Sequence, residues 1–215
     1  MLIEKNAKLL FIGDSITDAG RNKPVGEGRN GAWGTGYVNV AGGLVGARYP
    51  ERRIRIVNMG VSGNTARDLA ERWQRDVLDM EPDWLSVMIG INDVWRQFDN
   101  PLRPEIHVEL DEYRETLDDL LGQVRGDLDG LVLMTPYFIE PHREDPMRAM
   151  MDRYGEACRE LARAHDAIFV DVQAAFDRVL EHRHPMGLAW DRVHPTIEGH
   201  SVIGRAFLQA VDFEF

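Results

Sequence analysis

The sequence contains a single cysteine, Cys158, among its 215 residues. One cysteine cannot form an intramolecular disulfide, and a lone thiolate cannot build a cysteine metal cluster. Cys158 lies in a helical pattern over residues 154–161, which favours a buried, inert thiol over a nucleophile. The sequence therefore lacks both a disulfide framework and a good candidate for a catalytic cysteine.

Long apolar runs are also missing, and basic residues are fewer than acidic ones. No apolar run is long enough to cross a bilayer, and residues 1–8 lack the cleavage site of a signal peptide, so we expect a cytoplasmic protein. The 25 Lys and Arg residues against 36 Asp and Glu residues give a formal net charge of -11. Such a surface repels polyanions, so neither nucleic acid nor an anionic membrane is the expected partner. A neutral or cationic small substrate fits better.

Strand-like and helix-like segments alternate along the whole chain. Short apolar or β-branched runs predict five strands, at residues 9–12, 53–58, 84–90, 131–135 and 167–171. Amphipathic patterns predict helices at residues 37–49, 66–80, 110–124, 146–164, 174–181 and 197–210. The irregular segment 94–104 is interpreted as a loop. This alternation predicts one α/β domain over residues 1–215, with a five-stranded parallel sheet and helices on both of its faces.

A serine follows the first predicted strand. Gly13 tolerates a sharp turn, so the chain can leave Ser15 exposed at the carboxyl edge of the sheet, where its hydroxyl could act as a nucleophile. Asp and Ser are also ordinary turn and helix-cap residues, so this signal is weak alone. The glycine-rich segment 18–36 follows directly, and we interpret it as an active-site loop that shapes the substrate mouth.

Three further polar clusters can supply what a serine nucleophile needs. Near the end of the chain, Asp191 and His194 lie three positions apart, which brings their side chains to the same side of a turn. His194 suits the role of base, and Asp191 can hold its productive tautomer. The amides of Ser15 and Gly63 and the side-chain amide of Asn92 can donate hydrogen bonds to an oxyanion. Together these residues predict acyl transfer.

Four blocks of the sequence resemble, in order, the signature blocks of the SGNH (GDSL-type) hydrolases: residues 13–17, 62–64, 90–93 and 191–194. The resemblance implies a flavodoxin-like three-layer α/β/α fold that needs no metal or cofactor. It also implies that Ser15 is the nucleophile and an oxyanion donor, that Gly63 and Asn92 are the other donors, and that His194 is the base with Asp191 as its partner. Ile16 stands where leucine often follows the serine, which is a conservative change.

Two longer stretches, residues 89–96 and 188–195, resemble the intracellular acetylxylan esterases of the same superfamily. This resemblance implies that the partner is a small acetylated carbohydrate, an acetyl ester on a xylo-oligosaccharide, and that the protein is a homo-oligomer. Trp33, Trp95 and Trp190 flank the predicted site, where indole faces could stack on sugar rings or simply pack. Asp14 is a further candidate substrate contact, although Asp14 and Asp93 fit better as residues that hydrogen-bond loop amides.

Other functions are weighed against this one. A metal site is not expected, because the histidines match no strong metal signature. A lipid esterase or thioesterase on the same scaffold would need an apolar segment 18–36, which is instead polar and rich in glycine. A non-catalytic carbohydrate-binding protein would be expected to have a damaged triad, yet all the catalytic residue types are present. The sequence therefore predicts a serine carboxylester hydrolase that removes acetyl groups from a small carbohydrate.

Overall fold

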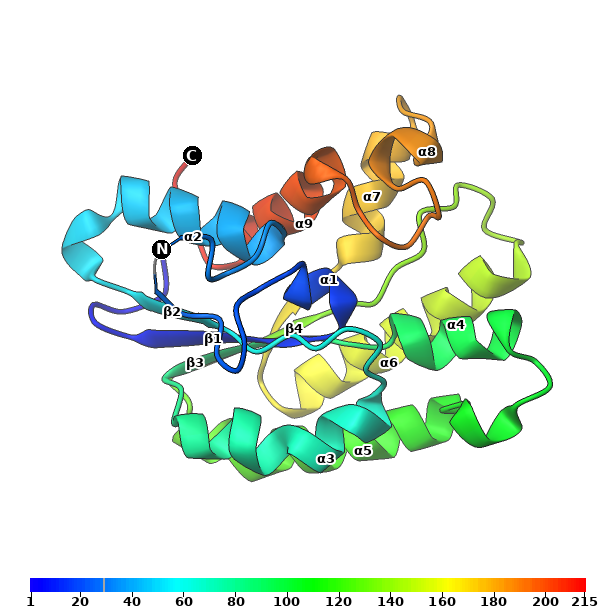
Figure 1. Cartoon of the computed structure of the whole chain (residues 1–215), viewed down its shortest axis with the longest axis horizontal. Helices are drawn as coiled ribbons and strands as arrows, with labels where there is room; N and C mark the ends of the chain where they lie inside the picture. Colours follow the sequence, from blue (N-terminus) through cyan, green and yellow to red (C-terminus); the bar gives the residue numbers. More distant parts are fainter. Residues whose placement is uncertain (29) are drawn as a thin grey trace.

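A five-stranded parallel sheet forms the centre of the computed structural model, which describes residues 1–28 and 30–215 (Figure 1). The strand order is β2-β1-β3-β4-β5, the flavodoxin-like order, and every neighbouring pair is parallel. The strands are β1 Lys8–Gly13, β2 Arg55–Asn58, β3 Trp84–Met88, β4 Gly130–Met134 and β5 Ile168–Val170. The predicted α/β fold and its parallel sheet are confirmed.

The central strands are buried on both faces because helices cover the sheet from two sides. All residues of β3 and β4 are buried, as are those of β1 after Lys8. Their side chains therefore form near-continuous apolar runs, which is why the sequence pattern identified them. Gly13 pairs with Met88, and a Cβ at Gly13 would lie 2.2 Å from the Met88 carbonyl oxygen. Only glycine fits at this point, where β1 and β3 end side by side.

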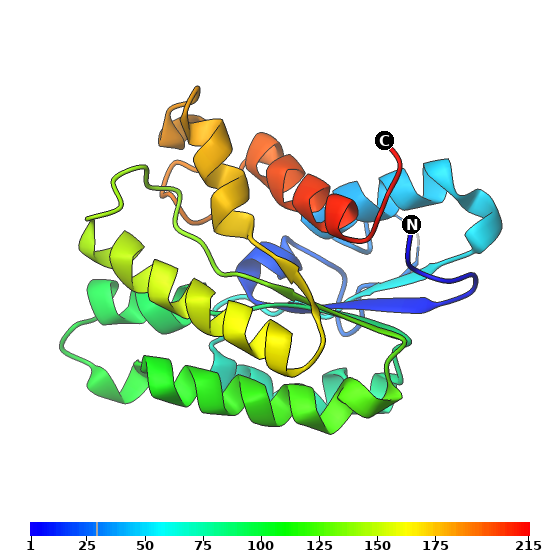
Figure 2. The ribbon, with the colours of Figure 1, turned by 180° about the vertical axis from the view of Figure 1, so that it is seen from behind.

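Helices α2, α7 and α9 cover one face of the sheet, and α3, α4, α5 and α6 lie on the other (Figures 1 and 2). Their bounds are α2 Tyr37–Arg48, α3 Ala66–Asp76, α4 Ile91–Asp99, α5 Leu110–Val124, α6 Pro146–Ala164, α7 Val172–Leu180 and α9 Ile197–Ala210. Among residues 1–28 and 30–215 there are also two short helices, α1 Ser15–Asp18 and α8 Pro185–Leu188. Four 3₁₀ turns lie in the same described ranges: η1 Pro50–Arg52, η2 Leu78–Met80, η3 Pro104–Ile106 and η4 Arg125–Asp127. None of the described helices combines the length and the apolar character needed to cross a membrane.

Several predicted helix ends agree with the structure, whereas the helix predicted at residues 174–181 begins and ends earlier, as α7 Val172–Leu180. Helices α5, α6 and α9 begin and end at the predicted residues. The side chains of Thr65, Asp171 and Thr196 each accept a hydrogen bond from an amide of the first turn of α3, α7 and α9, as N-caps do. The predicted helix over residues 66–80 is shorter, because α3 ends at Asp76 and η2 follows it.

The interpretation of residues 94–104 as a loop is wrong, because α4 continues to Asp99. Ile91 and Val94 are buried, and Trp95 packs against the core, at the spacing expected for one face of a helix. The polar pair between Ile91 and Val94 masked this pattern. Two prolines end the segment, but both follow Asp99 and do not interrupt the helix.

The predicted active-site loop 18–36 begins inside α1 and then runs along the edge strand β2. Gly26 forms an isolated bridge with Asn58 of that strand, and the Trp33 indole N–H donates to the Ile56 carbonyl oxygen over 3.0 Å. Residue 29 of this loop lies outside the described residues. The loop therefore covers part of the exposed β2 edge, and its predicted role at the substrate mouth stays a prediction.

Cys158 is fully buried in α6, as the sequence predicted. Its sulfur lies 3.0 Å from the Tyr113 hydroxyl oxygen. Burial raises the pKa of this thiol to about 12, so the reactive thiolate is not formed at neutral pH.

Candidate active site

The side chains of Ser15, His194 and Asp191 form one hydrogen-bonded chain, although Ser15 and His194 are 179 positions apart in the sequence. The Ser15 Oγ lies 3.0 Å from His194 Nε2, and His194 Nδ1 lies 2.7 Å from Asp191 Oδ2. An ionised carboxylate can only accept, so Nδ1 carries the ring proton and Nε2 is left to accept from the Ser15 hydroxyl. This arrangement puts a base directly on a serine hydroxyl.

The Asp191 carboxylate also holds the loop that carries His194. Its Oδ1 accepts from the amides of His194 at 2.8 Å and Val193 at 3.0 Å, while Oδ2 binds the imidazole. Burial raises the pKa of Asp191, but the hydrogen bonds from the His194 ring and from these two amides outweigh it and hold the pKa below its ordinary value. Asp191 is therefore ionised at neutral pH and keeps the ring oriented.

The segment after β4 contacts and supports this loop, a role that the sequence pattern did not predict. The Tyr137 hydroxyl donates to the Val193 carbonyl oxygen over 3.0 Å, and the Ile139 amide donates to the Arg192 carbonyl oxygen over 3.0 Å. Glu140 forms an ion pair with the Arg192 side chain. The only sequence signal was the apolar and aromatic run directly after the strand, which marks a buried connection rather than a surface loop.

The three predicted oxyanion donors lie on neighbouring segments at the carboxyl edge of the sheet. Ser15 is the first residue of α1, so its amide has no acceptor within the helix. The Val61 amide donates to the Gly13 carbonyl oxygen over 3.0 Å, which brings the loop of Gly63 against the Ser15 turn. The Asn92 side-chain amide donates to the Asn64 carbonyl oxygen over 2.9 Å, which joins α4 to the same loop.

Arg72 ties these segments together from α3. Its buried guanidinium donates to the Asn64 side chain over 2.6 Å and to the main-chain oxygens of Met59 and Gly13, both over 2.8 Å. Its charge is balanced by Asp76, 3.0 Å away. Because the groups that it joins lie 8 to 59 positions away, and only Asp76 is near in sequence, the pattern along the sequence gave no sign of this role.

Asp14 and Asp93 are buried beneath the site. Asp14 accepts from the Ile16 amide over 2.9 Å, and Asp93 Oδ1 accepts from the Ala66 amide over 2.9 Å. Burial raises the pKa of each carboxyl to about 7. Both side chains thus bind main-chain amides, but these amides belong to the first turns of α1 and α3 rather than to loops as expected. The substrate contact of Asp14 stays a prediction, and its 1 % exposure does not favour it.

The three candidate tryptophans occupy different places. The Trp95 ring lies next to the His194 ring, with centroids 5.7 Å apart. Trp190 is 78 % exposed immediately before Asp191, so its indole face is open to solvent. Trp33 lies against β2 and α2, where a Cβ at Gly42 would meet its ring at 2.9 Å. The structure therefore brings Trp95 to the triad, and it places Trp33 in a packing role.

No group of three metal-ligating side chains comes together within the part of the chain that the structure describes. Of the histidines considered for a metal, His200 is buried and accepts from the Tyr37 amide over 3.2 Å. Burial lowers the pKa of His200 to about 4, so its ring is neutral and serves as an acceptor at the start of α2.

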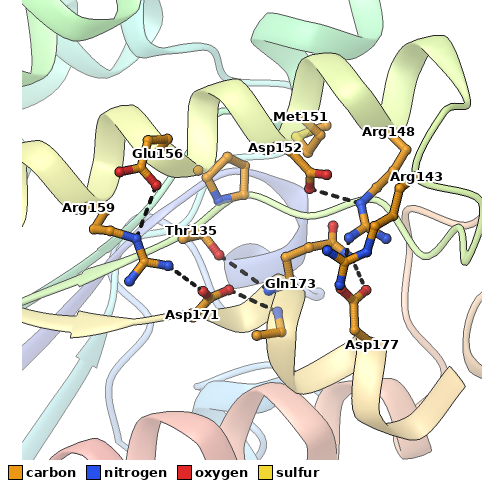
Figure 3. Close-up of a pocket in the computed structure, with 13 residues that line it drawn as sticks. Thr135, Arg143, Arg148, Met151, Asp152, Glu156, Arg159, Asp171, Gln173 and Asp177 are labelled. Atoms are coloured by element: carbon orange, nitrogen blue, oxygen red, sulfur yellow. Dashed lines mark hydrogen bonds and ion pairs between the residues drawn. The ribbon is translucent and has the colours of Figure 1, made fainter. Parts of the chain in front are cut away.

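A cavity of about 310 Å³ lies between α6 and α7, beside the ends of β4 and β5 (Figure 3). Its charged groups bind one another: Arg148 pairs with Asp152 and Asp177, and Arg159 pairs with Glu156 and Asp171 (Figure 3). The same Arg148 donates to the carbonyl oxygen of Glu140, over 2.6 Å. Through Arg148, the ion pairs that line the cavity therefore connect α6 and α7 to the segment that holds the His194 loop.

The chain is similar to a known protein family and to a known enzyme over most or all of its length. Residues 11–202 match the GDSL-like lipase/acylhydrolase family. An acetylxylan esterase of Geobacillus stearothermophilus is 54% identical over 215 residues, which cover 100% of this chain and 98% of that protein.

Solved structures are similar over the same length. The structure of Axe2, an acetylxylan esterase from Geobacillus stearothermophilus, matches with a TM-score of 0.98 at 54% identity and covers 100% of this chain and 98% of its own. Structures of Axe2 with the substitutions S15A, D191A and H194A are each described as a catalytic mutant. LAE5, an alpha/beta hydrolase enzyme from the metagenome of Lake Arreo in Spain, matches with a TM-score of 0.97 at 56% identity, over 98% of this chain and 97% of its own.

Proposed function

The chain belongs to the GDSL-like lipase/acylhydrolase family, and from that premise we propose that it removes acetyl groups from xylo-oligosaccharides or similar acetylated sugars. The observation that carries this proposal is the hydrogen-bonded chain from Ser15 through His194 to Asp191. A serine hydroxyl with a base at 3.0 Å and an oriented imidazole meets the geometric requirement for nucleophilic attack on an ester.

The reaction follows from the positions of these groups. The Ser15 Oγ attacks the acetyl carbonyl carbon while His194 Nε2 takes the hydroxyl proton. Asp191 stabilises the imidazolium that forms, and the same Nε2 then gives its proton to the leaving sugar oxygen. Water repeats the cycle on the acetyl-enzyme, releasing acetate and restoring Ser15.

We propose that three donors at the carboxyl edge of the sheet stabilise the developing oxyanion. The amides of Ser15 and Gly63 and the Asn92 side chain supply them, so little reorganisation is needed when charge appears on the substrate oxygen. Gly63 has φ +84°, a conformation in which a side chain would be strained, so glycine keeps its amide presented at this point.

The sugar part of the proposal is supported by the relatives and by the surroundings of the triad. The relatives at 54% identity are acetylxylan esterases. Trp95 beside His194 and the exposed Trp190 offer flat apolar faces on which a sugar ring can stack. The single domain over residues 1–215, the homo-oligomeric state and the cytoplasmic location belong to the same proposal, the last two through the resemblance to intracellular esterases.

Acetylated xylo-oligosaccharides provide the direct test, with released acetate followed by NMR. The wild type should release acetate, and Ser15→Ala should release none, nor any nitrophenol from its acetate ester. An acyl-length series of nitrophenyl esters tests the specificity, because an acetyl esterase should lose turnover as the chain lengthens. Activity that rises with chain length would point instead to a lipid esterase or thioesterase. Near wild-type turnover by Ser15→Ala would overturn the nucleophile assignment.

A further inference from the structure

We infer that Arg96 is a positioning residue of the oxyanion hole, which holds the Asn92 side-chain amide so that one of its N–H groups faces the substrate oxygen. This inference rests on the proposed function, because it assigns a second residue to the same site. Arg96 Nη2 donates to Asn92 Oδ1 over 3.2 Å. The two residues are one helical turn apart on α4, so they share a face of that helix.

The Asn92 amide has two opposite neighbours that select one of its two possible orientations. On one side, the Asn64 carbonyl oxygen accepts from Asn92 Nδ2 over 2.9 Å; on the other, Arg96 donates to Oδ1. A carbonyl can only accept and a guanidinium can only donate. Turning the amide over would place two oxygens together and two groups of N–H donors together. The remaining Nδ2 hydrogen is therefore free to bind an oxyanion.

Arg96 is itself held in place by its surroundings. It forms an ion pair with Asp99, and its guanidinium lies 5.0 Å from the centre of the Trp95 ring. Trp95 in turn lies against His194, the proposed base. The Asp99 side chain is 29% exposed, so removal of Arg96 leaves this carboxylate accessible to water rather than buried without a partner. Arg96 can thus be changed without an expected collapse of the fold.

The charge of Arg96 also strengthens the donor that it orients. A cation on Oδ1 withdraws electron density from the amide, which makes the Nδ2 hydrogens better donors. The ester carbonyl is neutral in the ground state and carries a full negative charge in the tetrahedral intermediate. The contribution of Arg96 should therefore appear mainly in the transition state, and so in kcat rather than in KM.

A double-mutant cycle tests the inference with nitrophenyl acetate as the substrate. Asn92→Ala should lower kcat by about 100-fold or more, as expected for the loss of one oxyanion donor. Arg96→Gln should lower kcat by roughly 10-fold with KM within about 2-fold, because it loosens that donor without removing it. The double variant should be no slower than Asn92→Ala alone, since Arg96 acts only through that side chain.

Two further variants separate positioning from loss of charge or loss of structure. Arg103→Gln removes an exposed arginine of the following loop and should leave kcat unchanged. Arg96→Lys keeps the charge but loses the planar fork, so its kcat should lie between those of the wild type and Arg96→Gln. Thermal unfolding by circular dichroism should show the Arg96 variants folded at the assay temperature.

The outcomes distinguish the inference from the function on which it rests. Effects that multiply in the double variant, or an Asn92→Ala variant with wild-type kcat, would overturn the role of Arg96 while leaving the esterase activity in place. A rise in KM with unchanged kcat in Arg96→Gln and Arg96→Lys would make Arg96 a substrate contact instead. Failure of the wild type to release acetate from acetylated xylo-oligosaccharides or nitrophenol from its acetate ester would remove the proposed function itself, and the inference with it.

Discussion

Replacing Asp93 with asparagine should change the free energy of unfolding, relative to the wild type, more favourably at pH 8 than at pH 5. Asp93 is fully buried next to the proposed oxyanion donor Asn92. Its Oδ1 accepts from the Ala66 amide over 2.9 Å, whereas its Oδ2 has no hydrogen-bond partner among the described residues. Burial raises the pKa of this carboxyl from 3.8 to about 7. The folded protein therefore holds a proton that the unfolded chain releases.

The sign and size of the effect follow from this difference in pKa. Well below pH 3.8 the carboxyl is protonated in both states, so its ionisation does not affect the free energy of unfolding. As the pH rises towards 7 the unfolded chain loses its proton first, and stability is lost at up to about 1.4 kcal/mol per pH unit. Between pH 5 and pH 8 the loss amounts to about 2 to 3 kcal/mol. Asparagine has no proton to lose, so the variant escapes this loss.

Urea unfolding followed by tryptophan fluorescence at both pH values measures the effect. The difference in free energy of unfolding between the variant and the wild type should shift by about 2 to 3 kcal/mol in favour of Asp93→Asn from pH 5 to pH 8. Any cost of the amide that does not depend on pH cancels in this comparison. Asp119→Asn, on the exposed side of α5, controls for the removal of a carboxyl at the surface. An equal difference at both pH values would refute the reasoning.

Three other substitutions, and one control at Gly43, test the site and the segments around it. Asp191→Asn should lower kcat on nitrophenyl acetate by about 10⁴-fold, because an amide favours the wrong tautomer of His194; a loss of less than about 10-fold would contradict this role. Gly60→Ala should cost about 1 to 3 kcal/mol in urea unfolding, since its Cβ would lie 2.3 Å from the Asp18 amide nitrogen. Gly43→Ala on α2, with nothing within 4 Å, should instead gain about 0.5 to 1 kcal/mol; equal effects would argue against the clash. Tyr137→Phe should cost about 1 kcal/mol in the same assay through its lost bond to the catalytic loop, and an unchanged stability would count against that support.

The elements that the sequence predicted well are those whose pattern is local. The buried strands appear as apolar runs because helices cover the sheet on both faces. Helices α5, α6 and α9 have amphipathic faces, and Asp145 and Thr196 cap the starts of α6 and α9. The start of α4 was missed because it also carries functional groups. Asn92 and Asp93 point into buried, polar surroundings, so the first turn does not show the usual separation of apolar and polar faces.

The supporting residues of the site could not be predicted because their partners are distant in sequence. Arg72 binds Gly13, and Tyr137 binds Val193, through contacts that span 59 and 56 positions. The neighbouring sequence does not show that Arg72 is buried, and the apolar run around Tyr137 indicates a buried segment without indicating its partner. The same holds for Trp33 and Trp95, because only the fold places one against β2 and the other against the triad.

The sequence by itself determined the chemistry that is available: a serine after a buried strand, an aspartate and a histidine close enough in the chain to meet, and the order of the four motifs. It could do so because the spacing of apolar residues and the reactivity of side chains are properties of short segments. Only the tertiary structure decided which groups meet and which merely support them. Hydrogen bonds are effective over about 3 Å, and only the paired strand ends bring residues from distant parts of the chain that close together.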